Sequence, residues 1–203
     1  MAKLLVINGS PTPGSSTELL LASAVHGFES SLPEKNVTVE LVVLNELTFI
    51  PCQACGKAPT PKFCFYDDSL TSIYNQIAEC DAFLLGSPIY FDSVSAQTKA
   101  FIDRCNCFRP PDFDNRDPEH DFIKILRRKR PGGLILVGGK DAWFEGARRT
   151  VAGFFKWIEV TNEGMVVFRS DDYCKSGMAT DNEQSLSEAR LLGKQIAERI
   201  LHG

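Results

Sequence analysis

A chain of 203 residues with 43% hydrophobic and 24% charged side chains has the composition of one soluble globular domain, so we treat residues 1–203 as a single unit. Its net charge of −4 and isoelectric point near 5.4 argue against a nucleic-acid surface, because such domains carry a strong basic excess. No apolar run approaches the roughly 18 residues that a membrane span requires.

The first residues and the cysteine content indicate a cytoplasmic protein. The chain enters the apolar run "KLLVINGS" directly, without the charged, apolar and cleavage regions of a signal peptide. Seven cysteines are an odd number and lack the spacing of a secreted disulfide framework, so we expect mostly reduced thiols. The three histidines are scattered along the chain, which argues against a histidine-based metal site.

The first half of the chain alternates predicted strands with predicted helices. Short apolar runs without polar alternation are typical of strands buried on both faces, and they occur at residues 3–8, 37–44 and 81–87. Apolar residues at helical spacing predict helices over residues 16–32, from about residue 69, and over residues 93–105.

The second half continues the same alternation after an interruption. Further buried strands are predicted at residues 132–139 and 164–169, with helices over residues 147–158 and 186–200. The basic run "RRKR" at residues 127–130 precedes a strand, and we interpret it as a solvated helix end or turn rather than a phosphate site.

The interruption, residues 108–131, is predicted to form a surface excursion. Its first part, residues 108–122, carries three prolines among many acidic residues. Connections of this length inside a compact domain are usually lids, interface arms or mobile segments. We therefore expect it to gate substrate access or to contact a partner subunit.

Five short strands alternating with helices call for a parallel sheet that is covered on both faces and joined by right-handed crossovers. The sequence therefore predicts a doubly wound α/β fold. In such sheets, ligands bind beyond the carboxyl ends of the strands, where the strand order reverses. The loops after the first, third and fourth strands are the candidate site.

The loop after the first strand, "NGSPTPGSSTE", has the features of an anion site. Two glycines allow tight turns, and the free N–H groups of a helix start attract negative charge. It has neither the G-K-[ST] order of a Walker loop nor a G-x-G-x-x-G fingerprint, so a nucleoside triphosphate is disfavoured. Ser15 and Glu18 also form an S-x-x-E capping box, which explains the serine-rich start equally well without a ligand.

Three segments together resemble the flavodoxin-like NADPH-dependent FMN reductases and iron–sulfur flavoproteins. They are "GSPTPGSSTE", "GSPIYFDSVSAQTKAFIDR" at residues 86–104, and the glycine pair at 138 and 139. The resemblance covers most of residues 1–160 and implies a flavodoxin-like five-stranded sheet that binds FMN. It implies that the phosphate is bound by Ser10, Thr12, Ser15, Ser16 and Thr17. It also implies that the flavin ring is lined by Pro88, Ile89, Tyr90 and Phe91 and approached at its pyrimidine edge by Gly138, Gly139 and Lys140.

Two positions depart from the pattern of these families. Many relatives have arginine where this chain has Thr12, so one cationic partner of the phosphate is missing. The iron–sulfur flavoproteins carry four closely spaced cysteines after the second strand, and here Cys52, Cys55 and Cys64 match three of them while Ala58 replaces the other. Cys105 or Cys107 could supply a fourth thiolate, but nothing in the sequence places either one nearby. We expect free thiols rather than a [4Fe–4S] cluster or a structural zinc.

The resemblance implies an FMN-dependent oxidoreductase that takes a hydride from NAD(P)H and reduces a quinone, a flavin, a nitro or azo compound, or a metal complex. It also implies a homodimer or homotetramer. Hydride transfer needs no proton-transferring side chain, so we predict no catalytic residue. Two alternatives stay open: an electron-transfer (iron–sulfur) flavoprotein without NAD(P)H activity, and a sensor or interaction protein that has lost the flavin.

Overall fold

The computed structural model describes residues 1–32, 37–57, 63–126, 128–171 and 177–202. Ala58 and Arg127 therefore lie outside the described residues. The strands are β1 (Ala2–Asn8), β2 (Val37–Val43), β3 (Ala82–Tyr90), β4 (Ser93–Val94), β5 (Arg130–Gly139) and β6 (Val160–Ser170). The α-helices are α1 (Ser16–Ser30), α2 (Thr71–Glu79), α3 (Ala96–Arg104), α4 (Glu145–Trp157) and α5 (Glu183–His202), and the short 3-10 helices are η1 (Leu44–Glu46), η2 (Cys105–Phe108) and η3 (Met178–Asp181).

The sheet confirms the predicted fold. Five strands run parallel in the order β2-β1-β3-β5-β6, and β4 pairs antiparallel with the end of β3. This is the strand order of flavodoxin-like proteins, and it reverses between β1 and β3. The carboxyl ends of these two central strands are consequently the place where a ligand can enter between diverging loops.

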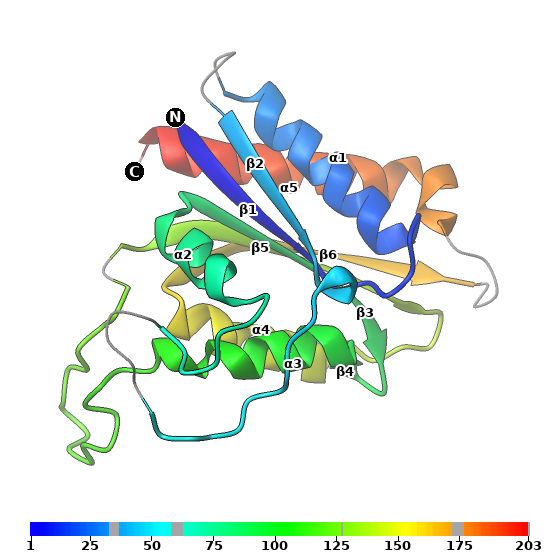
Figure 1. The fold of residues 1–203 in the computed structure, drawn as a ribbon. Helices are drawn as coiled ribbons and strands as arrows, with labels where there is room; N and C mark the ends of the chain where they lie inside the picture. The colour runs from blue at the N-terminus through cyan, green and yellow to red at the C-terminus, as the bar shows by residue number, and fades with distance from the viewer. Residues whose placement is uncertain (33–36, 58–62, 127, 172–176, 203) are drawn as a thin grey trace.

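Helices cover both faces of this sheet (Figure 1). α1 and α5 lie together on one face, whereas α2, α3 and α4 lie on the other. Each face has its own apolar core, and the central strands contribute alternate residues to the two, such as Leu5 and Ile7 to one and Leu4 and Val6 to the other. Across the described ranges, no helix is both long and apolar enough to cross a membrane.

The α1 and α5 helices approach each other at two glycines. A Cβ added at Gly193 would lie 1.8 Å from the carbonyl oxygen of Ala24, and one added at Gly27 would lie 2.0 Å from the carbonyl oxygen of Arg190. Backbone therefore meets backbone at this crossing. The packing depends on the absence of side chains at these two positions.

Arg130 corrects one sequence prediction. The run at residues 127–130 was expected to be solvated, yet Arg130 is the first residue of β5 and only 2% exposed. Its guanidinium donates hydrogen bonds to the carbonyl oxygens of Ile77 and Ile158 and to the Cys80 sulfur. Burial lowers its pKa. The cation thus satisfies backbone carbonyl groups at the C-terminal ends of α2 and α4. These partners cannot be recognised from the basic run itself.

The described part of the excursion, residues 109–126 and 128–129, contains neither helix nor strand. The strand β5 starts at Arg130, two residues before the predicted start at residue 132. The excursion is held by local contacts. The His120 Nε2 atom and the Asp112 carboxylate are in hydrogen-bond contact at 2.5 Å, and the ring centroids of Phe113 and Trp157 of α4 lie 5.5 Å apart. Gating or subunit contact by this segment stays a prediction.

Substitution of Gly193 by alanine should destabilise the fold, because the new methyl group cannot fit against Ala24 without moving α5 away from α1. We expect Gly193→Ala to lower the free energy of unfolding by about 2 kcal/mol or more, measured by urea denaturation. The matched control is Gly153→Ala in α4, where a Cβ meets nothing within 4 Å. It should raise stability by about 0.5–1 kcal/mol through helix propensity, and equal effects of the two changes would contradict the close packing.

Candidate functional site

The loop after β1 is stabilised by its own polar groups. The Asn8 side-chain oxygen accepts a hydrogen bond from the Ser10 N–H at 2.9 Å. The hydroxyl of Ser10 is within 3.3 Å of both the N–H and the carbonyl oxygen of Thr12. Ser10 is buried and Thr12 is exposed. Of these two predicted phosphate ligands, Thr12 is thus the one that presents its side chain to solvent.

The start of α1 confirms Ser15 as the helix cap, whereas the reciprocal bond of the predicted capping box falls one residue earlier. The Ser15 hydroxyl accepts from the Glu18 N–H at 3.3 Å, and the Glu18 carboxylate accepts from the Gly14 N–H at 2.9 Å. Gly14 has a φ of 65°, the left-handed conformation that glycine tolerates best. Within the described part of the chain, the N–H groups of Ser16 and Thr17 have no hydrogen-bond partner, as expected in a first helical turn. These donors and the positive end of the helix suit an oxyanion.

The side chains of Ser16 and Thr17 point away from this loop. The Ser16 hydroxyl accepts a hydrogen bond from the Ala179 N–H of η3 at 3.1 Å. The Thr17 methyl group packs close to Gly86 of β3, where an added Cβ would lie 2.9 Å from it. The five predicted hydroxyls are therefore not all brought together as side chains. Ser16 and Thr17 present their backbone N–H groups instead.

The second predicted segment begins as strand and ends as a tight hairpin. Pro88, Ile89 and Tyr90 belong to β3, which runs three residues further than predicted, and Ile89 and Tyr90 pair with β4. Phe91 and Asp92 form the turn with φ values of 52° and 57°. Two consecutive left-handed residues are the geometry of a type I′ turn, which usually requires glycine or asparagine. The turn therefore stores backbone strain.

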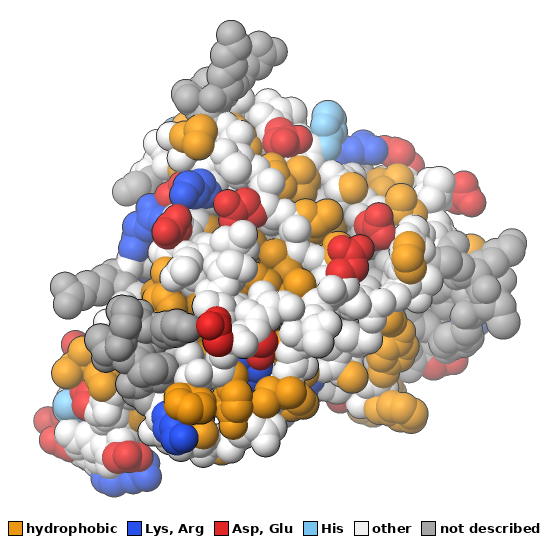
Figure 2. Space-filling model, viewed as in Figure 1, with side chains coloured by type: hydrophobic (Ala, Val, Ile, Leu, Met, Phe, Trp, Pro, Cys, Tyr) orange, Lys and Arg blue, Asp and Glu red, His pale blue; other side chains and the backbone are white. Residues whose placement is uncertain are grey.

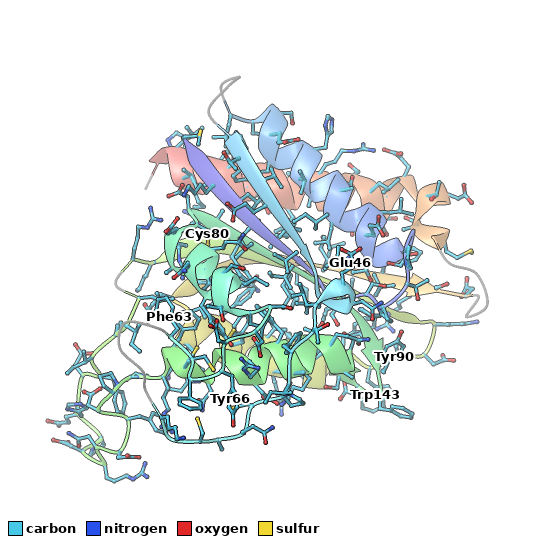
Figure 3. All side chains as sticks on the ribbon, in the orientation of Figure 1. Glu46, Phe63, Tyr66, Cys80, Tyr90 and Trp143 are labelled. Atoms are coloured by element: carbon cyan, nitrogen blue, oxygen red, sulfur yellow. The ribbon has the colours of Figure 1, made fainter. Side chains whose placement is uncertain are left out.

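This hairpin places aromatic side chains beyond the carboxyl ends of the strands. Tyr90 is about half exposed and Phe91 is fully exposed. The carboxylate of Asp92 accepts a hydrogen bond from the Gly146 N–H at 3.0 Å, which fixes the hairpin on the start of α4. Tyr90 and the exposed Trp143, which precedes α4, lie at the same end of the molecule (Figure 3). The result is an apolar surface at the edge where the strands end.

A buried hydroxyl network joins the first two loops. The Ser95 hydroxyl donates to the carbonyl oxygen of Gly9 at 2.7 Å and caps α3 by accepting from the Thr98 N–H at 3.2 Å. Ser87 accepts from the Ser95 N–H at 3.0 Å and contacts the Thr98 hydroxyl at 3.3 Å. The sequence analysis missed these three residues. The usable signal was Ser95 itself, a serine directly before a helical pattern.

The loop after β5 is the third part of the candidate site. Gly138 is buried, and a Cβ there would lie 2.6 Å from Ala142, so the chain turns back closely on itself. Lys140 is exposed. Arg169 at the end of β6 donates to the carbonyl oxygens of Lys140 and Ala142 at 3.2 and 2.6 Å, and its guanidinium lies 4.5 Å from the centre of the Phe144 ring. Arg169 therefore positions this turn, a role that the sequence did not suggest.

The segment that carries Cys52, Cys55 and Cys64, described at residues 51–57 and 63–68, is called the cysteine segment. It lies apart from these three loops, over α2 and α3. Cys52 and Cys64 are partly exposed and Cys55 is exposed. Among the residues that the structure describes, no three cysteine, histidine or acidic side chains converge in an arrangement that could hold a metal ion. The Cys64 sulfur instead accepts a hydrogen bond from Arg104 at 3.6 Å. A [4Fe–4S] cluster requires convergent thiolates, and the expectation of free thiols here stays a prediction.

Fold and site together define a flavodoxin-like α/β protein with a candidate anion site and an apolar surface at the carboxyl edge of its sheet. The chain matches the NADPH-dependent FMN reductase family over residues 2–169, and it belongs to this family of flavin-binding oxidoreductases. An iron–sulfur flavoprotein of Methanocaldococcus jannaschii is 28% identical over 209 residues, which cover 98% of this chain and 97% of that protein.

Two further similarities are of comparable extent. A Bacillus subtilis protein named as an NAD(P)H-dependent FMN-containing oxidoreductase is 28% identical over 195 residues, covering 95% of this chain and 97% of that protein. The solved structure of an NAD(P)H:quinone oxidoreductase from Methanothermobacter marburgensis has a TM-score of 0.67 at 14% identity, covering 95% of this chain and 96% of that one. The last comparison concerns the fold alone.

Removal of the Ser95 hydroxyl should loosen the junction between the first two loops. We expect Ser95→Ala to lower the free energy of unfolding by about 2 kcal/mol, since it removes a helix cap and leaves the Gly9 carbonyl without its donor. The measurement is urea denaturation, with Ser30→Ala as the control because its partly exposed hydroxyl contacts only Gly27 of its own helix at 3.2 Å. A Ser95→Ala variant as stable as the control would contradict a structural role for the network.

Proposed function

We propose that the carboxyl-edge site binds FMN and that the protein transfers a hydride from NAD(P)H to a small electron acceptor. The acceptor class is a quinone, free flavin, nitro or azo compound, or metal complex. The observation that carries the proposal is the combination of N–H groups at the start of α1 that have no partner among the described residues with an exposed aromatic hairpin at the end of β3. One end suits a phosphate and the other suits a flat apolar ring.

The phosphate would be held mainly by neutral donors. The N–H groups of Ser16 and Thr17 point out of the helix start, and the hydroxyls of Ser10, Thr12 and Ser15 surround the same loop. Hydroxyl and amide donors add no fixed charge, so the helix dipole would supply most of the electrostatic attraction. The Glu18 carboxylate on Gly14 opposes a dianion there and would have to move aside.

The ring would lie between the hairpin and the loop after β5. Pro88, Ile89, Tyr90 and Phe91 offer apolar and aromatic surface on one side, and Gly138 and Gly139 allow close approach of backbone on the other. When bound, FMN supplies the hydride-accepting chemistry. This chain's part is to hold the ring, exclude water from one face and place the Lys140 ammonium near its pyrimidine edge. A cation there favours negative charge on that edge.

We also propose that the protein acts in the cytoplasm as a homodimer or homotetramer. The exposed aromatic residues Tyr90, Phe91 and Trp143 support an assembly, since large apolar side chains gathered at one edge often mark an interface or a substrate surface. An electron-transfer flavoprotein that receives electrons from another protein is the second candidate. The iron–sulfur flavoprotein relatives favour it, and the unsuitable thiol arrangement counts against the cluster that it would need.

Anaerobic addition of NADPH to the FMN-loaded protein is the decisive experiment. We expect the visible flavin absorbance to bleach without any partner protein, and NADH in a parallel sample serves to rank the two donors. A flavin that stays oxidised with both nucleotides but is bleached by dithionite would contradict the reductase proposal and favour the electron carrier. A protein that stays colourless after incubation with FMN would contradict both.

The missing cation at position 12 predicts a gain in affinity when it is restored. Thr12→Arg should bind FMN roughly fivefold more tightly, about 1 kcal/mol, because an exposed guanidinium would neutralise phosphate charge at the start of α1. Quenching of FMN fluorescence measures the dissociation constant. The matched control is Thr12→Gln, which has similar reach but no charge and should bind like the parent. The gain should shrink at high salt, and an unchanged or weaker affinity would place the phosphate elsewhere.

A further inference from the structure

The tip of the β3–β4 hairpin is attached to the start of α4 by one carboxylate. Asp92 accepts a hydrogen bond from the Gly146 N–H at 3.0 Å, across 54 positions of sequence. Gly146 is the second residue of α4, and Phe144 at the N-cap position forms no cap with its own side chain. Asp92 therefore supplies a cap from outside the helix, and its negative charge suits the positive end of the helix.

The backbone of the hairpin also lies directly against this helix. A Cβ added at Gly146 would lie 2.3 Å from the Asp92 carbonyl oxygen and 2.9 Å from its carboxylate. Only glycine leaves room for this approach, so the hairpin and α4 are joined by close packing as well as by a hydrogen bond. Both contacts would be lost if the hairpin moved away from α4.

The turn of the hairpin needs such an attachment. Phe91 and Asp92 have φ values of 52° and 57°, at the two positions where a type I′ turn favours asparagine and glycine. Phe91 is fully exposed, so its side chain gains no packing that would offset this strain. Residues other than glycine stay in such conformations only where surrounding contacts hold them, and the bond from Gly146 to Asp92 is a contact of this kind.

Through α4 the attachment reaches the loop after β5, which is the other side of the candidate ring site. The sheet joins the two sides at their base, where Pro88 of β3 pairs with Val137 of β5. Beyond that pair, Phe144 lies close to Gly138, because a Cβ there would be 3.0 Å from the ring. Asp92 binds the hairpin to the helix that directly follows Phe144. The spacing of the two sides is thus set by strand pairing at the base and by Asp92 at the tip.

Exposed aromatic side chains lie on both of the segments that Asp92 joins. Tyr90 belongs to the hairpin, and Trp143 belongs to the loop between β5 and α4. Hydrophobic side chains gather at the lower right of Figure 2, in the region where Figure 3 labels Tyr90 and Trp143. A planar ring bound between the two segments would depend on the spacing that Asp92 sets.

We propose that Asp92 is a positioning residue for the flavin ring, because its bond to Gly146 holds the hairpin at the spacing from the loop after β5 that a bound ring requires. This inference rests on the proposed function, which assigns the ring to the space between these two segments. Asp92 acts through the hairpin, whose residues 88–91 would contact the ring, and not at the reacting atoms. Its effect on FMN therefore depends on the acceptor oxygen and not on the negative charge.

The test compares FMN affinity and stability in variants of the full chain. Asp92→Gly removes the carboxylate but relaxes the left-handed turn, so the urea midpoint should stay close to that of the parent while FMN binds roughly tenfold more weakly. Asp92→Asn keeps an acceptor oxygen and favours the same backbone conformation, so its affinity should stay within about twofold of the parent.

Glu145→Gln is the matched control for charge. It removes a negative charge from the same helix start, where the Glu145 carboxylate accepts from Arg148 and Arg149 of α4 itself. If only charge at the end of α4 mattered, this variant would behave like Asp92→Gly. We expect it to bind FMN within about twofold of the parent, because the hairpin keeps its hydrogen bond.

Gly146→Ala tests the same contact from the helix side. The new methyl group must displace the Asp92 carbonyl oxygen, so FMN should bind about fivefold more weakly although alanine favours the helix. Fluorescence quenching measures the dissociation constants. The visible spectrum of bound FMN reports the same change, because a more loosely held ring in Gly146→Ala and Asp92→Gly should have bands closer to those of free FMN.

Three results would overturn this inference alone. They are an Asp92→Gly variant that binds FMN like the parent, an Asp92→Asn variant as weak as Asp92→Gly, and a Glu145→Gln variant with the same loss of affinity. If Asp92→Gly does not fold, the comparison of Gly146→Ala with Asp92→Asn decides the question. A parent protein that binds no FMN would instead overturn the proposed function and this inference with it.

Discussion

The close approach of β1 and β3 at their carboxyl ends is the constraint on which the site depends. The Gly9 N–H donates to the Gly86 carbonyl oxygen at 2.8 Å, and a Cβ at Gly9 would lie 1.8 Å from the Thr98 hydroxyl oxygen. No side chain therefore fits at position 9, where the end of β1 lies against α3. The Ser95 hydroxyl then fixes the start of α3 on the Gly9 carbonyl. The first two loops diverge from a rigid junction, so their spacing is set before any ligand arrives.

Near the cysteine segment, a single buried cation makes the contacts between segments that several hydroxyls make at the junction of β1 and β3. Arg104 is the largest fully buried side chain, and it joins Ile50, Asp68 and Cys64 across α3. Its Nε has no partner within the described residues, a cost that is tolerable because the rest of the guanidinium is hydrogen-bonded. Arg130 likewise donates hydrogen bonds to the carbonyl oxygens of Ile77 and Ile158 at the C-terminal ends of α2 and α4. Two buried arginines thus hold segments together in the layer of α2, α3 and α4, on the sheet face opposite α1 and α5.

The pattern of apolar residues was enough to predict the order of strands and helices, because a short unbroken apolar run has few interpretations other than a buried strand. It failed where a single residue has a tertiary partner. Arg130 looks solvated in the sequence since its partners, Ile77 and Ile158, are remote backbone carbonyls. Pro88 looked like the end of a strand, but β3 continues through it. The packing of Phe63 on Phe108 likewise joins residues far apart in the sequence, for which no local pattern exists.

The same limit applies to the candidate phosphate loop, where the family resemblance implied five hydroxyl ligands by their position in the sequence. Ser16 and Thr17 lie on the inward face of α1, so the Ser16 hydroxyl meets the Ala179 N–H of η3 and the Thr17 methyl group packs by Gly86 of β3. These two residues offer the loop only their backbone N–H groups, which any sequence could supply. The specific contributions of this chain are then the exposed Thr12 and the Glu18 carboxylate on the Gly14 N–H. Both make the site less positive than a site with arginine at position 12 would be, so its affinity for an anion must rest on geometry and the α1 dipole more than on charge.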